Sequence, residues 1–243
     1  MSDTSDDTSS SSSEDDGLPK LLTWESNFKK GKHKSILVIG ARNTGKSYFI
    51  KHLYQKKLKK LYDTVIVFSN SILSGFYQEF IDSELIFSEY TAEVIEALEE
   101  SQKEMISRCG KALNVLIIFD DCISSKNKHD EMLRQCFTRG RHNPMNLTVL
   151  FSTQIATLAD PSWRMNTDLL FITKQKGQGS KSHITKFFMS GLYDDEDMIG
   201  YKNETKFLND LLKRRTLDYH MLCVDYTIDS VEAKDIVKAY KAP

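Results

Sequence analysis

The chain has 243 residues, 40% of them hydrophobic, which is enough for the core of one substantial domain or two small ones. The formal net charge of −1 hides an uneven distribution, because the first 17 residues hold six acidic residues and no lysine or arginine. The remainder carries 33 basic and 28 acidic residues, a mildly basic balance that permits a nucleic-acid partner without requiring one.

Two classes of protein are disfavoured by the composition. The four cysteines include no C-x-x-C pair and no histidine at zinc-finger spacing, which indicates reduced thiols in an intracellular protein rather than a disulfide scaffold or zinc site. The longest uninterrupted apolar run, Val115 to Phe119, is far shorter than the ~20 residues that span a bilayer. With no signal-peptide pattern either, we expect a soluble intracellular protein.

The chain divides into a tail and a body. Residues 1–17 are rich in Ser, Asp and Glu and have no apolar residue between Met1 and Leu18, so they are predicted to be disordered. A solubilising tail is the preferred interpretation; a phosphorylated tail or an electrostatic mimic of DNA is the alternative. Residues 18–243 are predicted to form a single α/β domain, with a small C-terminal α/β extension from about residue 176.

The basic lead-in at residues 18–34 contains two aromatic residues, Trp24 and Phe28, which we expect to pack on the core rather than on a nucleotide. A helix is predicted to follow the strand at 36–39 and to end near Leu61. Its lysines at positions 56, 57 and 60 share one face, interpreted as a solvated face, with a DNA-backbone stripe as the alternative.

The turn between this strand and helix carries the clearest motif in the chain. Gly40, Gly45, Lys46 and Ser47 stand at the spacing G-x-x-x-x-G-K-S. Such glycines let backbone N–H groups point at phosphate oxygens, the lysine supplies a cation for the β- and γ-phosphates, and the serine hydroxyl can bind Mg²⁺. The helix N-terminus adds its positive dipole end. The predicted nucleotide-binding segment comprises Gly40, Ala41, Arg42, Asn43, Thr44, Gly45, Lys46, Ser47 and Tyr48.

Strands alternate with helices over the rest of the chain, which predicts a mainly parallel sheet with right-handed crossovers and ligands at the carboxyl ends of the strands. Strands are expected at 64–68, 85–87 (a short edge strand), 114–119, 147–151, 168–173 and 219–224. Helices are expected at 91–108 (capped by Thr91), 130–137, 204–214 and 231–240, and an apolar stretch lies at 184–189.

Two of these strands end in residues suited to phosphate chemistry. The strand at 114–119 leads into Asp120 and Asp121. Asp120 is expected to hold Mg²⁺ through water, and Asp121 to polarise the attacking water as a general base. The next strand leads to Gln154, whose neutral amide can donate to a γ-phosphate and accept from the attacking water.

Arginines follow in two further segments. Arg139 and Arg141 belong to an Arg-Gly-Arg-His run, and Arg164 follows Pro161 by three residues. We expect at least one of the three to stabilise transition-state charge as an arginine finger, which in ring motors usually reaches the site of the next subunit. Arg141 and Arg164 are the two we select. A structural ion pair is the alternative for each.

The order of these motifs resembles that of the genome-packaging ATPases of large DNA viruses, the poxvirus type within the FtsK/HerA superfamily. The order is the phosphate loop, the strand ending in Asp-Asp, Gly-Arg-His, the strand ending in Ser-x-Gln, and Pro-x-x-Arg-x-Asn. The resemblance covers roughly residues 33 to 175. It implies that Gly45, Lys46 and Ser47 bind ATP, that Asp120 and Asp121 handle Mg²⁺ and water, and that Gln154 senses the γ-phosphate. The wider superfamily more often ends the acidic strand in Asp-Glu.

The resemblance also implies a fold and partners. The fold is the additional-strand, RecA-like type of P-loop NTPase, with helices flanking a sheet in which the sensor strand lies between the strands bearing the phosphate loop and the paired acids. The implied partners are double-stranded DNA, capsid or portal-like vertex proteins and further copies in a homo-oligomeric ring. The expected location is the host cytoplasm, in the viral factory, and the virion.

The leading functional prediction is therefore an ATP-hydrolysing DNA translocase that packages viral genomic DNA into the capsid. One alternative is a P-loop kinase acting on a small molecule or a polynucleotide, although the only adjacent arginine pair downstream of the motifs is Arg214-Arg215. The other is a nucleotide-dependent binding module that does not hydrolyse, against which the paired aspartates argue.

Overall fold

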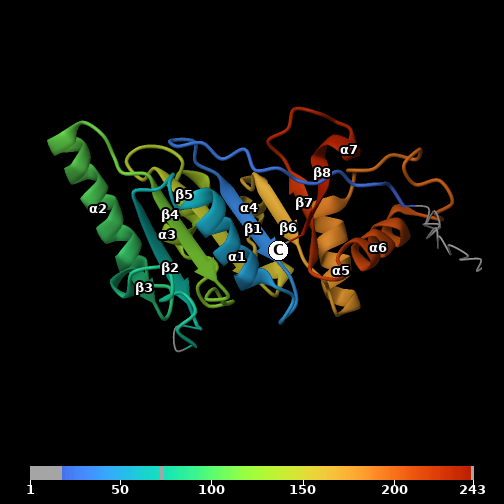
Figure 1. The fold of residues 1–243 in the computed structure, drawn as a ribbon, viewed down its shortest axis with the longest axis horizontal. Coiled ribbons are helices and arrows are strands. Elements are labelled where there is room, and N and C mark those ends of the chain that lie inside the picture. Colours follow the sequence, from blue (N-terminus) through green and yellow to red (C-terminus); the bar gives the residue numbers. More distant parts are fainter. Residues whose placement is uncertain (1–17, 72–73, 242–243) are drawn as a thin grey trace, which may run out of the picture.

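The computed structural model describes residues 18–71 and 74–241, so the predicted disordered tail at 1–17 lies outside the described residues. Eight strands form one sheet in the order β3-β2-β4-β5-β1-β6-β7-β8 (Figure 1). The strands are β1 (Ser35–Ile39), β2 (Thr64–Ser69), β3 (Ile86–Phe87), β4 (Val115–Asp120), β5 (Leu147–Thr153), β6 (Leu169–Ile172), β7 (His220–Asp225) and β8 (Val237–Lys241).

The helices are α1 (Lys46–Leu53), α2 (Ala92–Cys109), α3 (Glu131–Thr138), α4 (Pro161–Met165), α5 (Gln178–Ile184), α6 (Glu204–Arg215) and α7 (Ala233–Ile236). Two of them continue as π-helix, α1 through Tyr54–Leu58 and α5 through Thr185–Met189. Figure 1 shows α2 and α6 towards opposite ends of the molecule, with α1 over the sheet between them.

The central strands are parallel, and their order confirms the predicted fold. β5 pairs in parallel with β1 on one side and with β4 on the other. The strand leading to Gln154 therefore lies between the strands that lead into the phosphate loop and the paired aspartates, as the resemblance implied. Parallel strands place their carboxyl ends at one edge of the sheet, so the three motifs meet there.

Burial of both faces explains the continuous apolar character of these strands. In β1, Ile36 and Val38 face a core layer with Phe49, Ile50 and Leu53 of α1. The alternate residues of β1 face a second layer that contains side chains from α2 through α6. Every residue of β1, β4 and β5 is buried, as is typical of parallel strands covered by helices on both faces.

The C-terminal end corrects one prediction, because the helix expected at 231–240 is wrong. Only Ala233–Ile236 is helical, and Val237–Lys241 forms strand β8, antiparallel to β7. The Tyr240 ring lies among Trp24, Phe49 and Phe171, at centroid distances of 5.7, 5.4 and 6.3 Å. Pairing with β7 and this aromatic packing override the helical spacing of the local sequence.

Two expectations about local contacts have different outcomes. Thr91 occupies the N-cap position of α2, but its side chain makes no capping hydrogen bond, so the predicted cap is wrong in that respect. Trp24 packs in the core as predicted: it is 4% exposed, and its ring lies 5.0 Å from that of Phe171. Trp24 N donates to Ala239 O and Ala239 N donates to Leu22 O, which ties the lead-in to β8.

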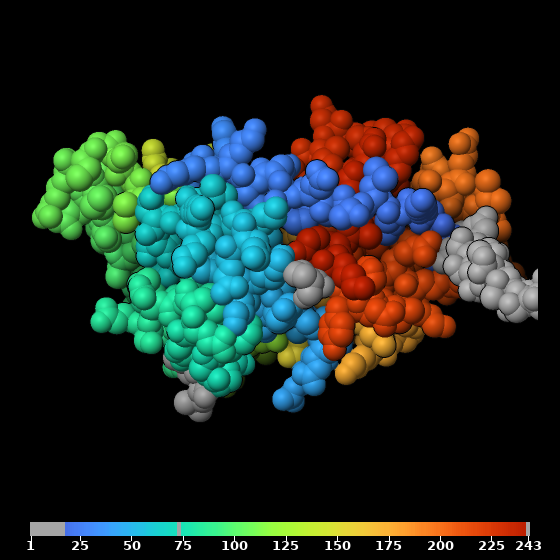
Figure 2. Space-filling model, viewed as in Figure 1, coloured from blue at the N-terminus to red at the C-terminus, as the bar shows by residue number. Residues whose placement is uncertain are grey.

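The lead-in crosses the surface of the molecule. At its start, Arg215 donates to the carbonyl of Leu18, and towards its end Lys30 forms an ion pair with Asp63. Figure 2 shows this segment in blue, running across the face from the C-terminal elements to the region of α1 and β2. The lysines at 56, 57 and 60 are exposed, and their interpretation stays a prediction. Within the described ranges, no helix combines the length and apolar character needed to cross a bilayer.

Candidate nucleotide-binding site

The turn that follows β1 has the backbone geometry its glycines predict. Asn43 and Gly45 both have positive φ angles, 61° and 90°, and α1 starts directly afterwards at Lys46. At Gly45 only glycine takes this conformation without steric cost. Gly40 is required for space instead, because a Cβ atom there would lie 1.6 Å from Oγ1 of Thr173.

Hydrogen bonds within and around the turn hold it in shape. The Thr44 hydroxyl donates to the carbonyl of Ala41 at 2.7 Å, and its oxygen lies 2.6 Å from that of Thr173 at the end of β6. Gly40 N donates to Thr153 O at 3.1 Å, which ties the turn to β5. The loop is therefore fixed between the two strands that flank β1.

Asp120 lies beside the start of α1, in contact with two hydroxyl groups. Its Oδ2 atom accepts hydrogen bonds from Ser47 Oγ at 2.9 Å and from Tyr77 OH at 2.8 Å. Its Oδ1 atom is buried. Ser152, the partner of Asp120 across β4 and β5, also interacts with this carboxylate and lowers its pKa.

Burial dominates the electrostatics of this carboxylate. Asp120 is 4% exposed, and removal from water raises its pKa, with the nearby Asp121 acting in the same direction. The hydrogen bond from Tyr77 opposes that rise. Burial also raises the pKa of Tyr77 well above its usual range, so the phenol stays a donor.

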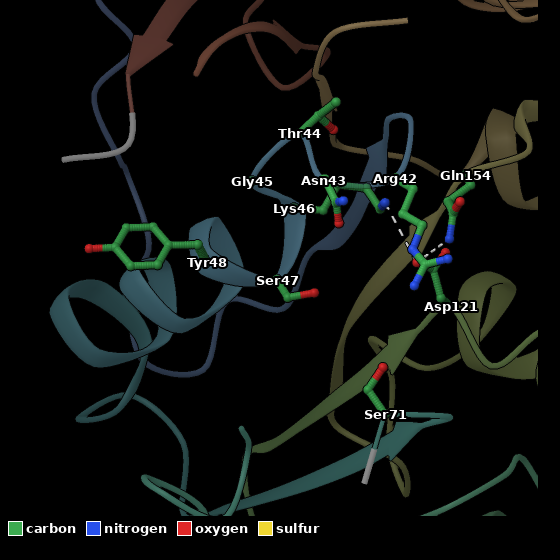
Figure 3. A pocket seen from close by; sticks show the side chains of 10 residues that line it. All are labelled: Arg42, Asn43, Thr44, Gly45, Lys46, Ser47, Tyr48, Ser71, Asp121 and Gln154. Atoms are coloured by element: carbon green, nitrogen blue, oxygen red, sulfur yellow. Dashed lines mark hydrogen bonds and ion pairs between the residues drawn. The ribbon is translucent and has the colours of Figure 1, made fainter. Parts of the chain in front are cut away.

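Asp121 occupies a left-handed backbone position, with φ at 50°, a conformation that Asp tolerates better than most residues. Its Oδ2 atom lies 3.5 Å from Lys46 Nζ and accepts a hydrogen bond from Gln154 Nε2 at 3.0 Å. Figure 3 shows Lys46 and Gln154 reaching Asp121 from opposite sides, with Arg42 also pointing towards it. The short side chain of Asp121 thus reaches both neighbours.

These residues line a pocket of about 360 Å³ with a strongly polar wall. The lining comes from the phosphate loop, the start of α1, the loop after β2, and the ends of β4 and β5: Arg42, Asn43, Thr44, Gly45, Lys46, Ser47, Tyr48, Ser71, Asp121 and Gln154. Lys46, Ser47, Asp121 and Gln154, all predicted for the site, therefore converge at one edge of the sheet.

The groups present fit Mg²⁺ held together with a phosphate ligand. A serine hydroxyl hydrogen-bonded to one carboxylate suits an ion that usually keeps several water molecules and completes its shell with substrate phosphates. The described residues contain no cluster of three His, Cys, Asp or Glu side chains that could enclose a metal alone. Ser47 and Asp120 are the residues that would hold the ion.

The predicted arginines lie elsewhere in this chain. Arg141 pairs with Asp168 at 3.0 Å, and Asp168 in turn accepts from the backbone N of Ser35, at the start of β1. Arg141 therefore lies at the edge of the sheet opposite the pocket and does not reach the site of its own chain. Arg139 is exposed at the C-cap of α3.

Arg164 lines a separate pocket and packs on Phe187, with the guanidinium carbon 4.6 Å from the ring centroid. For both selected arginines, the structure shows a structural contact within the chain. A role at a neighbouring subunit's site stays a prediction.

Sequence reasoning missed Tyr77, which reaches Asp120 from the segment after β2. Its surroundings in the sequence, Phe76, Phe80 and Ile81, are the pattern of core packing, and no local signal separates its hydroxyl from that background. It also missed Asn70, whose amide donates to the carbonyl of Asp121 at 2.8 Å. Only tertiary pairing of β2 with β4 brings these residues to the acidic strand.

Comparison with known proteins agrees with this geometry. Residues 25–158, more than half of the chain, match the family described as Poxvirus A32 protein. Uncharacterized protein 088R of Invertebrate iridescent virus 3 is 26% identical over 209 residues, covering 86% of this chain and 75% of the relative. Uncharacterized protein 015R of Frog virus 3 is 23% identical over 212 residues, covering 86% of this chain but only 61% of the relative.

Solved structures share the fold at low sequence identity. The genome packaging NTPase B204 from Sulfolobus turreted icosahedral virus 2, in complex with ATP-gammaS, superimposes with a TM-score of 0.60 at 18% identity, over 86% of this chain and 98% of that one. EssC from Geobacillus thermodenitrificans gives a TM-score of 0.51 at 14% identity, over 73% of this chain and 42% of that one. With its phosphate loop, paired aspartates and strand order, the chain belongs to the Poxvirus A32 protein family.

Proposed function

We propose that this chain is an ATP-hydrolysing DNA translocase that packages viral double-stranded DNA into a capsid. One observation carries the proposal: Lys46 and Gln154 both contact the carboxylate of Asp121, at 3.5 and 3.0 Å, although the three residues follow three different strands. Ser47 and Asp120, the next residue along α1 and the preceding residue of β4, contact each other at 2.9 Å. A cation, a base, a neutral sensor and a metal-binding pair are the parts that phosphoanhydride hydrolysis needs.

The distances support a role for each group. Lys46, only 6% exposed, donates to the β- and γ-phosphates, and binding there replaces its present contact with Asp121. Asp121 is thereby free to accept the proton of the attacking water as that water adds to the γ-phosphorus and ADP leaves. Gln154 orients the same water by accepting one of its hydrogens and donating to the phosphate.

Magnesium, held by Ser47 and through water by Asp120, would supply charge neutralisation on the β- and γ-phosphates. The backbone N–H groups of the loop from Gly40 to Gly45 bind the β-phosphate, since the positive φ angles at Asn43 and Gly45 let successive N–H groups point inward. The start of α1 adds its dipole.

Support for DNA packaging comes from the comparisons. B204, the structural neighbour, is described as a genome packaging NTPase, and the relatives are proteins of large DNA viruses. The mildly basic body and the exposed lysines of the first helix suit contact with a DNA backbone. On this basis we propose a homo-oligomeric ring on double-stranded DNA at a capsid vertex, in the viral factory of the host cytoplasm and in the virion.

The test measures phosphate release from ATP with and without double-stranded DNA, together with the molecular mass in solution. We expect hydrolysis that depends on Mg²⁺, stimulation by DNA, and a multimer. Lys46→Ala should reduce hydrolysis by at least about a hundredfold, because it removes a buried cation aimed at the transferred phosphate. Unchanged hydrolysis in Lys46→Ala would overturn the site assignment. Transfer of the γ-phosphate to an acceptor would instead indicate a kinase, and ATP binding without phosphate release, even with DNA, a binding module.

A further inference from the structure

The polar pocket accounts for the phosphates of a nucleotide but not for its base. Its lining contains one aromatic residue, Tyr48, and the other nine residues carry polar side chains or none. In Figure 3 the ring of Tyr48 points away from Asp121 and Gln154, on the opposite side of the loop. If the γ-phosphate lies beside Asp121 and Gln154, the base leaves the loop on the side of Tyr48 and away from β4 and β5.

The sheet order shows which element lies on that side. β1 is flanked by β5 on the γ-phosphate side and by β6 on the other, and β7 follows β6. Because β7 runs antiparallel to β6, its first residue, His220, lies at the same edge of the sheet as the phosphate loop. The residue immediately before this strand is Tyr219.

Tyr219 contacts the phosphate loop itself. A Cβ atom placed on Gly45 would lie 3.2 Å from Cδ1 of Tyr219 and 3.9 Å from Cε1, so the edge of the ring lies directly against the loop. Despite this contact, Tyr219 is 65% exposed. An aromatic ring that touches a phosphate loop and leaves most of its surface open has a face available to a ligand held by that loop.

The backbone that presents this ring is unusual. Asp218 and Tyr219 have φ angles of 49° and 61°, two successive left-handed residues of which neither is glycine. A bulky residue in this region is a conformational outlier, and such outliers gather at functional sites. The turn is held by the bond from His220 N to Leu217 O, at 2.9 Å. Glycine at 219 would adopt this conformation with less strain, so the aromatic ring is retained at a cost to stability.

We propose that Tyr219 is a stacking platform for the nucleobase of the nucleotide bound by the phosphate loop, an inference that rests on the proposed function. Stacking on an aromatic face tolerates every base, since each has a π-face, so the site should bind ATP and GTP with similar affinity. The ring is supplied by the C-terminal extension, which places base binding on a different part of the chain from phosphate binding.

The test compares two probes, ATP and inorganic tripolyphosphate, each with Mg²⁺, by equilibrium binding. Tyr219→Gly should raise the dissociation constant for ATP by about 5- to 100-fold and leave that for tripolyphosphate unchanged. Tyr219→Phe keeps the ring and should bind both probes as the parent chain does. Leu217→Ala, in the same turn and also exposed, is the matched control and should change neither constant.

Two further measurements separate stacking from a structural role. Tyr219→Gly should unfold at the same temperature as the parent chain or a higher one, because it relieves the left-handed strain, while its ATP affinity falls. In Tyr219→Trp, the new indole is exposed whereas Trp24 and Trp163 are buried at 4% and 1% exposure. Its fluorescence should respond to ATP and GTP but not to tripolyphosphate.

The results can separate a failure of the stacking role of Tyr219 from a failure of the proposed nucleotide site. A parent chain that binds neither probe would remove the nucleotide site altogether. Unchanged ATP affinity in Tyr219→Gly, with both probes bound by the parent chain, would overturn the platform and leave the proposed function standing. An equal loss for ATP and tripolyphosphate would also overturn it, because the tyrosine would then act on the phosphate loop rather than on the base.

Discussion

The parallel part of the sheet and its antiparallel extension are built differently. In β4, β5 and β1, buried apolar strands lead into polar groups that meet at one edge, so sequence order translates directly into a site. β7 and β8 complete the sheet by antiparallel pairing. The turn before β7 places Tyr219 beside Gly45, and β8 packs Tyr240 on the core. We therefore expect substitutions at the ends of β1, β4 and β5 to change ATP hydrolysis, and substitutions in β8 to change the free energy of unfolding.

Asp121→Asn should have the largest effect. The amide keeps the shape and the contact with Gln154 but cannot accept the proton, so phosphate release should fall by about 10² to 10⁴-fold while ATP binding persists. Asp121→Glu, which keeps a carboxylate, is the control and should retain much more activity. Single-turnover hydrolysis alongside equilibrium ATP binding would check this, and equal loss in both variants would argue against a general base at this position.

Tyr240→Ala tests whether β8 stabilises the fold. Its ring packs against Trp24, Phe49 and Phe171, so truncation should lower the free energy of unfolding by about 3 kcal/mol, measured by urea denaturation. Tyr240→Phe should lose far less. Since Tyr240 lies outside the pocket lining, the ATP dissociation constant of the folded variant should match that of the parent chain. A variant of full stability would contradict the packing account.

Tyr77→Phe removes the hydroxyl that donates to Asp120 at the end of β4. Without that donor, Oδ2 of Asp120 keeps only the hydrogen bond from Ser47, and the carboxylate loses a contact that fixes its position beside Ser47. The Mg²⁺ concentration for half-maximal hydrolysis should rise by about tenfold, as expected for one hydrogen bond to a charged group. Phe76, beside it in the chain, offers the matched change Phe76→Leu, which should leave the Mg²⁺ requirement alone. An unchanged requirement in both variants would remove Tyr77 from the site.

Asp63→Asn, just before β2, should have the smallest effect, a small loss of stability. Its carboxylate accepts from the backbone and side chain of Asn114, both at 2.9 Å, and these bonds lower its pKa to about 2. A lowered folded pKa stabilises the fold above the unfolded value near 4, and this stabilisation is lost as pH falls from about 4 through 2. Asp63→Asn should therefore reduce stability at pH 7 by no more than about 1 kcal/mol, with the difference shrinking towards pH 2 in acid unfolding curves.

The local sequence pattern was sufficient to predict the parallel strands and the residues at their ends. Continuous apolar runs such as Val115 to Phe119 identify strands buried on both faces, and the polar residues that end them follow directly in the chain. The positions of Lys46, Asp121 and Gln154 at one edge then follow from parallel pairing alone. Their catalytic roles stay predictions, as do the acidic tail and the division into domain and extension.

Contacts made by distant segments could not be predicted in this way. Val237 to Lys241 has a helix-compatible pattern and becomes a strand only because β7 offers an edge. Tyr77 and Tyr219 look like ordinary aromatic residues until folding brings one to Asp120 and the other to Gly45. The Arg141 ion pair likewise depends on Asp168, 27 residues away.

The site can be tested by a structure of the chain with a non-hydrolysable ATP analogue and Mg²⁺. We expect the γ-phosphate between Lys46, Asp121 and Gln154, and the metal at about 2.1 Å from Ser47 Oγ with the Asp120 carboxylate bonded to one of its water ligands. A nucleotide bound away from this edge of the sheet, or a metal with no contact to Ser47, would contradict it.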